Sequence, residues 1–440
     1  MRDVILHAFD WPFQQIAERA AQIAAAGYGA VLFAPALYTD ERGRDWWQRY
    51  QPKDYRVIRS FLGGKQDLVA AIEALHAVGV RAYMDLVFNH MANEKHVRPE
   101  DPYSFPGPRE LARYRDEAAE FQRDRLYGDL SIGLFGSVDF NPRGDIVNWD
   151  NLTEVQDRWL SGLPDLQLNA WVVGQQRQCV RALNELGADG YRVDAMKHMP
   201  PEHLRSVFAS EDTRDKYVFG EVLTGNDRQE AMFLWPLIVG SNFPCYDFPL
   251  HETLLRAFSF TGTLRELVDP AGLAQALPWN RAVTFTVTHD IPNNDLFRYQ
   301  LLERTDEYLA NVYLMGRDGG VPMIYSDHNE STPGHAEDRD RWSEAWRRYD
   351  VVQMVGFHNA VHGMPQRPLY EADGHLVFAR GDRGIVAINK TEHWQTADLW
   401  TWGLRHGRYR CQLHQHELWL DGEHLRLHLP PRQAQLWLHD

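Results

Sequence analysis

"FQQIAERAAQIAAAGYGAVLFAP", residues 13–35, runs from an Ala-rich amphipathic segment through a glycine into a short apolar stretch. The same unit returns in "DLVAAIEALHAVGVRAYMDLVFNH" (67–90), "QQRQCVRALNELGADGYRVDA" (175–195) and "EYLANVYLMGRDGGVPMIYSDH" (307–328). A glycine after the last apolar turn is typical of a helix end, so Gly27, Gly79 and Gly187 each mark a change from helix to strand. The four units predict helices that alternate with buried strands.

Alternating helices and strands are typical of parallel strands joined by crossover helices. The chain has 440 residues, which is long enough for a (β/α)8 TIM barrel with smaller domains attached. A doubly wound open sheet is the alternative arrangement. We therefore expect an α/β fold built on an eight-fold barrel.

Two regions interrupt this alternation. Residues 91–168, which include "ANEKHVRPEDPYSFPGPRE" and "SVDFNPRGDIVNWDN", are rich in Pro, Asp and Asn and show no helical or strand period. They are too long for an ordinary loop, so we expect an inserted, loop-rich domain after the third strand. From 349 to 440, short alternating runs such as "HLVFARGDRGIVAINK" predict a C-terminal antiparallel β-sandwich. The barrel would then comprise residues 1–90 and 169–348.

The charge balance restricts the class of partner. The chain carries 46 Lys and Arg against 61 Asp and Glu, a formal net charge of −15. This excess of acid disfavours nucleic acid and anionic membrane surfaces and permits a neutral substrate. Aromatic residues make up 12% of the chain, and their rings can stack on flat apolar faces of a ligand. We expect a monomer that binds neither nucleic acid nor membrane.

The cysteines indicate the compartment. Cys179, Cys245 and Cys411 are far apart and odd in number, which indicates neither a disulfide framework nor a metal cluster. The first residues, "MRDVILHAFDWPF", contain no apolar run of secretory-signal length, and no segment approaches transmembrane length without charges. We expect a cytoplasmic protein; a secreted protein whose signal has been removed is the alternative.

Charged residues follow several of the expected strands. "GYRVDA" presents Arg192 and Asp194 two residues apart, so both point to one side of a strand, either as a structural salt bridge or as part of a site. "AYMDLVFNH" ends at Asn89 and His90, "YVFGEV" presents Glu221, and "AVTFTVTHD" ends at His289 and Asp290. In a β/α barrel the C-terminal ends of the strands meet on one face, so three carboxylates would lie together at its mouth. Repulsion among them would raise at least one pKa.

Three acids without a reactive thiol, a phosphate loop or a nucleophile elbow favour glycoside hydrolysis by paired carboxylates. Asp194 would attack the anomeric carbon, with Arg192 keeping it ionised. Glu221 would protonate the leaving oxygen and later activate water. Asp290 would bind sugar hydroxyls and favour the positively charged transition state.

Five short motifs, in order, resemble those of the α-amylase superfamily of glycoside hydrolases: "DLVFNH" (85–90), "GLPDL" (162–166), "GYRVDAMKH" (190–198), "FGEV" (219–222) and "TVTHD" (286–290). "WWQRYQPKDY" (46–55) resembles the family's aromatic substrate platform. "GGVPMIYSD" (319–327) resembles its seventh-strand region, and "FARGDRGIVAINK" (378–390) its C-terminal β domain. The likeness covers nearly the whole chain and implies the family's barrel fold and glucan substrates.

The resemblance also assigns roles to individual residues. It implies that Asp194 is the nucleophile, Glu221 the acid/base and Asp290 the transition-state stabiliser. Contacts with the sugar chain are implied for Trp47, Tyr50, Gln51, His90, Arg192, Lys197, His198 and His289. Lys197 has a plainer interpretation, as a solvated side chain on an exposed loop.

Calcium is implied by the same resemblance, because the family commonly fixes its inserted domain to the barrel with oxygen ligands. The matching groups are Asn89, Asp165 and the main-chain carbonyl of His198. The alternative is that Asn89 and Asp165 only cap loops. Chloride is not expected, since Thr288 stands where the chloride-activated branch has an asparagine.

Within the superfamily, "GLPDLQLN" and "WWQRYQP" resemble enzymes that cleave polysaccharides internally, by a retaining double displacement. An α-1,4-glucan transferase is the alternative, because the same residues serve both reactions and only the access of water or a sugar acceptor differs. A carbohydrate-binding relative without activity is a more remote alternative, since all three acids are present.

Overall fold

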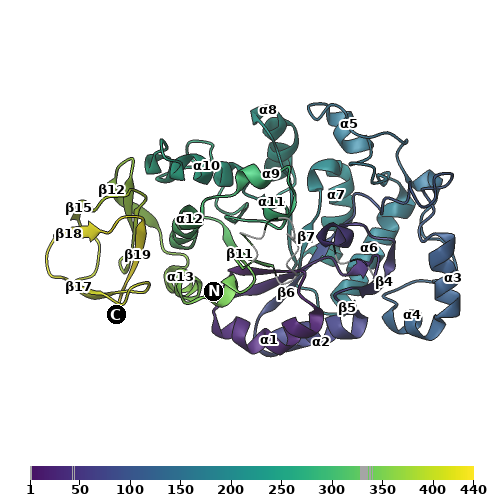
Figure 1. Ribbon diagram of the computed structural model, residues 1–440, viewed down its shortest axis with the longest axis horizontal. Helices are drawn as coiled ribbons and strands as arrows, with labels where there is room; N and C mark the ends of the chain where they lie inside the picture. Colours follow the sequence, from purple (N-terminus) through teal and green to yellow (C-terminus); the bar gives the residue numbers. More distant parts are fainter. Residues whose placement is uncertain (1, 42, 44, 328–334, 336–337, 339) are drawn as a thin grey trace.

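The computed structural model describes residues 2–41, 43, 45–327, 335, 338 and 340–440 (Figure 1). In this part of the chain, eight parallel strands close into a barrel in the order β1-β11-β10-β9-β8-β7-β6-β2. The strands are β1 (Ile5–Phe9), β2 (Ala30–Phe33), β6 (Arg81–Leu86), β7 (Gly190–Val193), β8 (Tyr217–Gly220), β9 (Cys245–Tyr246), β10 (Ala282–Thr284) and β11 (Val321–Asp327). The predicted TIM barrel is confirmed, and the open sheet is not what forms.

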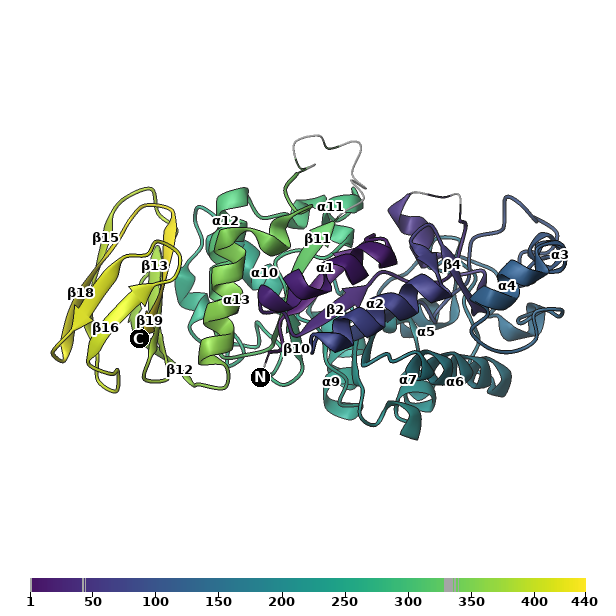
Figure 2. The same ribbon diagram turned by 90° about the horizontal axis from the view of Figure 1, so that it is seen from below.

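Helices surround the strands of the barrel on the outside (Figures 1 and 2). They are α1 (Phe13–Ala25), α2 (Lys65–Ala77), α6 (Ala170–Glu185), α7 (Pro201–Phe208), α9 (Trp235–Gly240), α10 (Phe248–Phe258), α12 (Arg304–Gly316) and α13 (Tyr349–Val361). The glycines that follow α1, α2 and α6 have positive φ angles, +96° at Gly27, +74° at Gly79 and +102° at Gly187. A left-handed glycine ends each helix as the sequence predicts, because it has no Cβ to clash with the backbone.

The interior of the barrel changes from apolar to charged along its axis. Apolar side chains from the strands form one cluster there: Ile5, Ala30, Leu32, Tyr83, Phe219, Tyr246, Val283 and Met323. Side chains alternate between the two faces of a strand, so Asp85 lies on the same face as Tyr83, and Glu221 on the same face as Phe219. Arg192 pairs in register with both Asp85 and Phe219. The charged layer therefore lies at the C-terminal ends of the strands, above an apolar floor.

Two excursions leave the barrel on the side away from the C-terminus (Figure 1). After β2 comes the sheet of β3 (Leu37–Tyr38), β4 (Asp54–Ser60) and β5 (Gly63–Gly64), which the sequence analysis did not predict. The region between β6 and α6 carries α3 (Pro108–Asp116), α4 (Ala118–Asp124) and α5 (Leu152–Asp157). It is otherwise irregular, with isolated bridges such as His90 to Asp165. This is the expected loop-rich insertion after the third barrel strand.

Antiparallel sheets form the C-terminal part of the chain, as expected (Figure 2). One has the order β12-β13-β14-β19-β16-β17 and the other pairs β15 with β18. The strands are β12 (Gln366–Glu371), β13 (His375–Arg380), β14 (Gly384–Asn389), β15 (Gln395–Trp400), β16 (Gly407–Cys411), β17 (Glu417–Leu420), β18 (His424–Leu429) and β19 (Gln433–His439). The expected boundary at 349 falls on the first residue of α13, and the antiparallel strands begin at Gln366.

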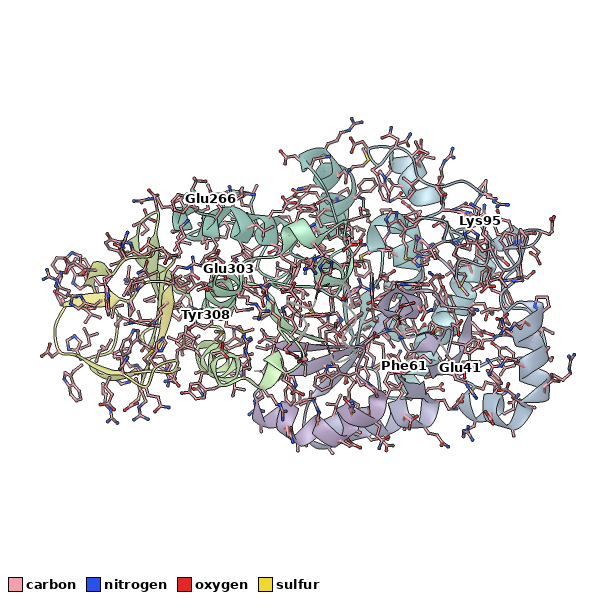
Figure 3. All side chains as sticks on the ribbon, in the orientation of Figure 1. Glu41, Phe61, Lys95, Glu266, Glu303 and Tyr308 are labelled. Atoms are coloured by element: carbon pink, nitrogen blue, oxygen red, sulfur yellow. The ribbon has the colours of Figure 1, made fainter. Side chains whose placement is uncertain are left out.

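Helix α12, between β10 and β11, packs against β14 and β19 of these sheets. Figure 3 shows Glu303, at its N-terminal cap, and Tyr308 on the side that faces the C-terminal strands. Arg432, between β18 and β19, lies 3.0 Å from Glu303 and 2.8 Å from Asp306. Ion pairs thus add to the apolar contact between the two parts. Among the described helices, none has both the length and the apolar character needed to cross a membrane.

Candidate active site

The chain leaves the barrel strands before it reaches some of the expected residues. β6 ends at Leu86, so the expectation that this strand extends to Asn89 and His90 is wrong. Beyond the end of β6 the chain pairs with the insertion, where His90 forms an isolated bridge with Asp165. Asp194 and Glu221 directly follow the last residues of β7 and β8.

Asp290 also lies outside the strand predicted to carry it. β10 ends at Thr284, and Asp290 is the first residue of the short helix α11 (Asp290–Asn293). Thr284 pairs with Pro322, which has no backbone N–H to donate, and the β10–β11 ladder stops there. Asp290 nevertheless lies at the mouth of the barrel, where it lines a large cavity.

One cavity of about 870 Å³ opens at the C-terminal ends of the strands. The sequence-predicted residues that line it are Trp47, Tyr50, Gln51, His90, Asp194, Lys197, His198, Glu221, His289 and Asp290. The structure therefore brings together the three acids and the predicted substrate-binding residues, except for Arg192. The side chain of Arg192 is fully buried, beneath the acids that it contacts.

Arg192 holds three carboxylates at once. Its Nη1 lies 2.9 Å from Oδ1 of Asp194 and 2.8 Å from Oδ1 of Asp85, and its Nη2 lies 2.7 Å from Oε2 of Glu221. The predicted contact between Arg192 and Asp194 is present. One guanidinium thus fixes the relative positions of both proposed reacting acids, since its planar fork can contact several oxygens.

Burial dominates the electrostatics of the acids. It raises the pKa of Glu221 above its usual value; Arg192 opposes this shift and Asp194 adds to it. Burial also raises the pKa of Asp290 well above its usual value, and the charge of Glu221 raises it further. The pKa of Asp194 is raised by burial, and Arg192 opposes the shift. Crowded, buried carboxylates suit a site in which one acid must hold a proton near neutral pH.

The side of the cavity formed by Tyr50 is rigid. The ring of Tyr50 stacks on His289 with centroids 4.7 Å apart and an interplanar angle of 6°. Its hydroxyl donates a 3.0 Å hydrogen bond to Oδ2 of Asp85, and Nε2 of His90 lies 3.0 Å from its carbonyl oxygen. Burial lowers the pKa of His90 to about 4 and that of His289 well below its usual value. Both histidines are therefore neutral hydrogen-bonding groups at neutral pH.

Lys197 and His198 lie on a short 3₁₀ helix (Met196–His198) directly after Asp194 and Ala195. Lys197 is only 7% exposed, so its interpretation as a solvated side chain on an exposed loop is wrong. Its Nζ lies 3.0 Å from Oε1 of Gln229 and 5.4 Å from the ring of Trp149. Nδ1 of His198 lies 2.9 Å from the carbonyl oxygen of Val155, in the insertion.

Asp85 is the main residue that the sequence analysis missed. It lies within the quoted motif "DLVFNH", but only Asn89 and His90 were singled out there. The signal available was a carboxylate inside an otherwise apolar strand, on the inward face and in register with Arg192. Burial raises the pKa of Asp85 to about 7, while Arg192 opposes the shift. The cavity wall also includes Trp149, Leu223 and Tyr299, which no motif indicated, and Trp46, which begins the motif "WWQRYQPKDY" but was given no role.

Two of the residues expected to bind calcium, Asn89 and Asp165, lie close together, where the insertion meets the barrel. The bridge between His90 and Asp165 places Asn89 beside Asp165, and the backbone N–H of Leu166 donates to the carbonyl of Asn89. Oδ2 of Asp165 accepts a 2.7 Å hydrogen bond from Asn141. Oδ1 of Asp165 is buried with no hydrogen-bond partner among the described residues. A buried, unpartnered carboxylate oxygen fits a cation that prefers hard oxygen donors.

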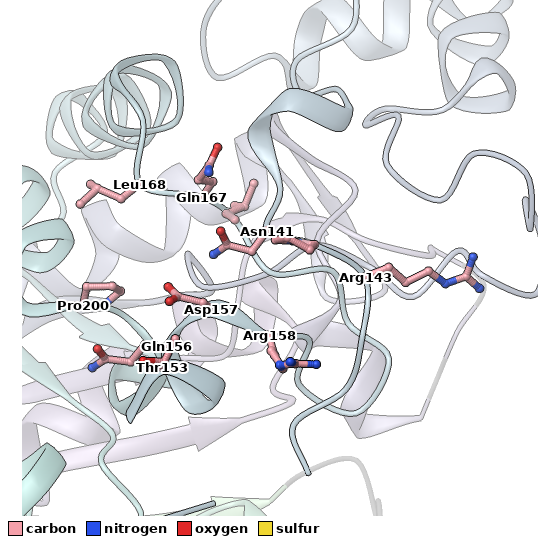
Figure 4. Close-up of a pocket in the computed structure, with 11 residues that line it drawn as sticks. Asn141, Arg143, Thr153, Gln156, Asp157, Arg158, Gln167, Leu168 and Pro200 are labelled. Carbon is pink, nitrogen blue, oxygen red and sulfur yellow. The ribbon is translucent and has the colours of Figure 1, made fainter. Parts of the chain in front are cut away.

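A second cavity, of about 680 Å³, adjoins this cluster on the insertion side. Asn141, Gln156, Asp157 and Pro200 are among its lining residues (Figure 4). The charge of Asp157 acts on Asp165 and raises its pKa, after the larger effect of burial. Two carboxylates and an amide thus lie near one another here, which supports the cation interpretation over simple loop capping.

Residues 13–235 match the alpha-amylase catalytic-domain family. The chain is also 44% identical over 404 residues to an alpha-amylase of Aeromonas hydrophila, and the match covers 89% of this chain and 85% of that protein. The chain belongs to the alpha-amylase family. It is therefore a glycoside hydrolase of this family, as the motifs implied.

Three further proteins show how far the likeness extends. An alpha-amylase of Thermomonospora curvata is 29% identical over 424 residues, which cover 89% of this chain and 64% of that protein. The crystal structure of alpha-amylase I from Eisenia fetida has a TM-score of 0.80 at 21% identity and covers 99% of this chain. A cyclomaltodextrin glucanotransferase with a three-domain ABC distribution has a TM-score of 0.74 at 20% identity. At these identities the two solved structures establish the shared fold alone.

Proposed function

We propose that the protein hydrolyses internal α-1,4-glucosidic bonds of starch, glycogen and maltooligosaccharides, with retention of anomeric configuration. The observation that carries this proposal is that Arg192 contacts Asp194 and Glu221 at the mouth of one large cavity. Two carboxyl groups held by one guanidinium are close, which favours the retaining separation of about 5–5.5 Å over the wider inverting one. A relative with 44% identity is itself named an alpha-amylase.

The glucan binds along the aromatic side of the cavity. The ring of Tyr50 lies under the sugar at the cleaved bond, and its stacking on His289 prevents it from turning away. Trp47, which is 44% exposed, stacks against a neighbouring sugar, and Gln51 adds a hydrogen bond. Lys197 and His198 bind sugars on the leaving-group side, where Lys197 lies against the ring of Trp149.

The reaction follows from the two acids that contact Arg192. Glu221, whose pKa burial raises, donates a proton to the glycosidic oxygen as the bond to the anomeric carbon breaks. The ionised carboxylate of Asp194, which accepts a hydrogen bond from Arg192, attacks that carbon and forms a glycosyl ester. Glu221 then removes a proton from water, and the water cleaves the ester with a second inversion.

Asp290 stabilises the positively charged transition state of each step. His289 Nε2 lies 3.6 Å from Oδ2 of Asp290, and both residues line the cavity. Asp290 accepts hydrogen bonds from sugar hydroxyls that strengthen as positive charge develops on the ring. His90, held by the carbonyl of Tyr50, orients the same sugar.

Calcium is the structural ion of this proposal. Asn89, Asp165 and the carbonyl of His198 would hold it, and Asp157 adds charge nearby. The bound ion would supply positive charge to the buried Asp165 and connect the insertion to the 3₁₀ helix that carries Lys197 and His198. It takes no part in the bond-breaking steps.

The products from soluble starch and from maltoheptaose test this proposal. With starch, we expect the viscosity to fall well before most reducing ends appear; with maltoheptaose, we expect only shorter oligosaccharides by chromatography. Products longer than maltoheptaose would assign glucan transfer instead. Asp194→Asn should abolish the products, whereas Asp116→Asn, at a side chain 71% exposed on α3, should leave them unchanged.

A further inference from the structure

Three metal-ligating side chains meet at the end of the barrel opposite the cavity. Asp3 precedes β1, while His358 lies on α13 and His362 directly follows its last residue. Oδ1 of Asp3 lies 2.9 Å from Nε2 of His358, and Oδ2 lies 3.1 Å from Nε2 of His362. One donor atom from each residue lies within 4.8 Å of the others. Figures 1 and 2 show the N-terminal end of the chain beside α13.

The sequence spacing places both imidazoles on one side of α13, because residues four apart are neighbours on a helix surface. Their ring centroids are 5.8 Å apart. The first residues of the chain run past this helix into β1, so Asp3 lies opposite the two rings. The cluster thus joins the N-terminal segment to the helix that follows β11, the barrel strand paired with β1.

The contact of Nδ1 of His358 with a backbone carbonyl determines where the hydrogen of the ring lies. Nδ1 of His358 lies 3.2 Å from the carbonyl oxygen of Met315. A carbonyl only accepts, so Nδ1 carries the hydrogen, and Nε2 of the neutral ring directs its lone pair at the carboxylate of Asp3. Two lone pairs that face each other across 2.9 Å require a positive charge between them, either a proton or a metal ion.

We propose that Asp3, His358 and His362 form a structural site for a late first-row divalent metal ion, with Zn²⁺ as the best fit. Two imidazole nitrogens and one carboxylate oxygen form a donor set that Zn²⁺ accepts, with bonds of about 2.0–2.2 Å. Tetrahedral ligands at that distance lie about 3.3 Å apart. The measured separations of 2.9 and 3.1 Å run to the two different oxygens of Asp3, so each nitrogen needs only a small expansion from its own oxygen, and the carboxylate would hold the ion through one or both oxygens. Taken one from each residue, the three donor atoms lie within 4.8 Å of one another.

The surroundings fit a structural ion. A metal-bound histidine usually donates its other ring N–H to a backbone carbonyl, which is what Met315 provides for His358. The side chain of His362 is 31% exposed, so a water molecule can reach the fourth ligand position. Two nitrogen donors disfavour Ca²⁺, which prefers oxygen, and so separate this site from the cluster at Asp165.

Zinc binding to the full chain, measured by calorimetry with calcium in excess, tests the proposal. The wild type should bind one more equivalent of Zn²⁺ than His362→Gln, or bind the same ion at least about tenfold more tightly. Zn²⁺ should also raise the melting temperature of the wild type by more than that of the variant, because the ion binds only the folded chain. Co²⁺ in place of Zn²⁺ should give the visible absorption of a four-coordinate ion in the wild type alone.

A matched control is available at His76. Its Nε2 lies 2.8 Å from Oδ2 of Asp189, so it repeats the His–Asp contact without a second imidazole. His76→Gln should keep the zinc stoichiometry and the melting response of the wild type. Asp3→Asn should lose them as His362→Gln does, which covers the case in which one variant folds poorly.

The alternative is a purely hydrogen-bonded cluster that holds a proton. In that case His362→Gln would lower the melting temperature equally with and without Zn²⁺, and its zinc stoichiometry would equal that of the wild type. Either result would overturn the proposal. An equal loss of zinc binding in His76→Gln would also overturn it, because any surface histidine would then suffice.

Discussion

Asp85 and Arg192 are register partners on neighbouring barrel strands, and Nη1 of Arg192 lies 2.8 Å from Oδ1 of Asp85. The other oxygen of Asp85 accepts a 3.0 Å hydrogen bond from the hydroxyl of Tyr50. Asp85 therefore connects Arg192, which contacts both Asp194 and Glu221, to Tyr50. It does not line the cavity among the described residues, so it acts as a positioning residue for Asp194 and Glu221.

Asp85→Asn should reduce kcat by about 100-fold with a smaller change in KM, because small displacements of reacting groups are costly. It should also move the alkaline limb of the pH–rate profile to lower pH. With the charge of Asp85 removed, Arg192 acts more strongly on Glu221 and lowers its pKa. Tyr50→Phe, which removes one hydrogen bond to Asp85, should cost only about tenfold.

The pH–rate profiles of a folded Asp85→Asn and of the wild type decide this assignment. A general structural defect would reduce the rate at every pH without moving the limb. An unmoved limb at reduced rate would contradict the positioning role.

His203 provides a test of pH-dependent stability away from the cavity. It is 1% exposed, its Nε2 lies 2.7 Å from Oε1 of Gln176, and burial lowers its pKa to about 4. Unfolded chains bind the histidine proton near pH 6.5, so the free energy of unfolding falls as the pH drops from 6.5 to 4. We expect the wild type to lose up to about 3 kcal/mol more than His203→Gln across this window.

Urea unfolding at pH 7.5 and pH 4.5 measures this difference. Only the change with pH is compared, so the cost of the substitution itself cancels. His393→Gln, at an exposed histidine of the C-terminal sheets, should follow the wild type. Parallel curves for His203→Gln and the wild type would show that His203 takes up its proton equally in both states.

The repeated helix–glycine–strand unit was enough to predict the barrel. Within about 25 residues, each unit shows the hydrophobic period of a helix, the glycine that ends it and the apolar run of the strand that follows. The small sheet of β3, β4 and β5 was missed because it has two strands of only two residues. The buried residues of helix α13 (Val351, Met354, Val355, Phe357, His358 and Val361) share one face, but Val352, Gly356 and Ala360 put apolar or small residues on the opposite face. The helix was missed because this weakens the contrast between the two faces.

The candidate site was predictable where a motif places residues directly after a strand, as with Asp194 and Glu221. The cluster of Asp3, His358 and His362 was not predictable from the sequence. Asp3 and His358 are 355 residues apart, and only the closure of the barrel brings them together. Trp149 was missed for a related reason. Its position against Lys197 depends on how an irregular insertion folds over the barrel, and no sequence period records that.

Chelation of calcium should lower both the melting temperature and the activity of the wild type, because an ion bound only by the folded chain stabilises it by mass action. Calcium, added in excess over the chelator, should restore both. Asp165→Asn should melt at a lower temperature and respond little to chelator. A wild-type melting curve that is indifferent to chelator and to added calcium would remove the ion from the account.

Chloride should have no effect on the rate. The Nη1 and Nη2 groups of Arg192 already lie against Asp85, Asp194 and Glu221. The buried Thr288, which precedes His289 and Asp290, offers a hydroxyl where an asparagine would offer an amide. A hydroxyl can direct its hydrogen elsewhere, so it is a weaker fixed donor. Starch hydrolysis in acetate and in chloride at matched ionic strength checks this across pH. A large gain in chloride, or a shift of the alkaline limb, would show that an anion binds near Arg192.

Covalent trapping tests the central claim, that Asp194 is the nucleophile of a retaining reaction, most directly. A 5-fluoro-α-maltosyl fluoride has a good leaving group but turns over slowly, so the glycosyl ester should accumulate. Intact mass should rise by one glycosyl unit, and peptide mapping should place the added mass on Asp194. The adduct should be absent from Asp194→Asn and should disappear when a sugar acceptor is added. An active enzyme that forms no adduct, or an adduct on any residue other than Asp194, would contradict the account.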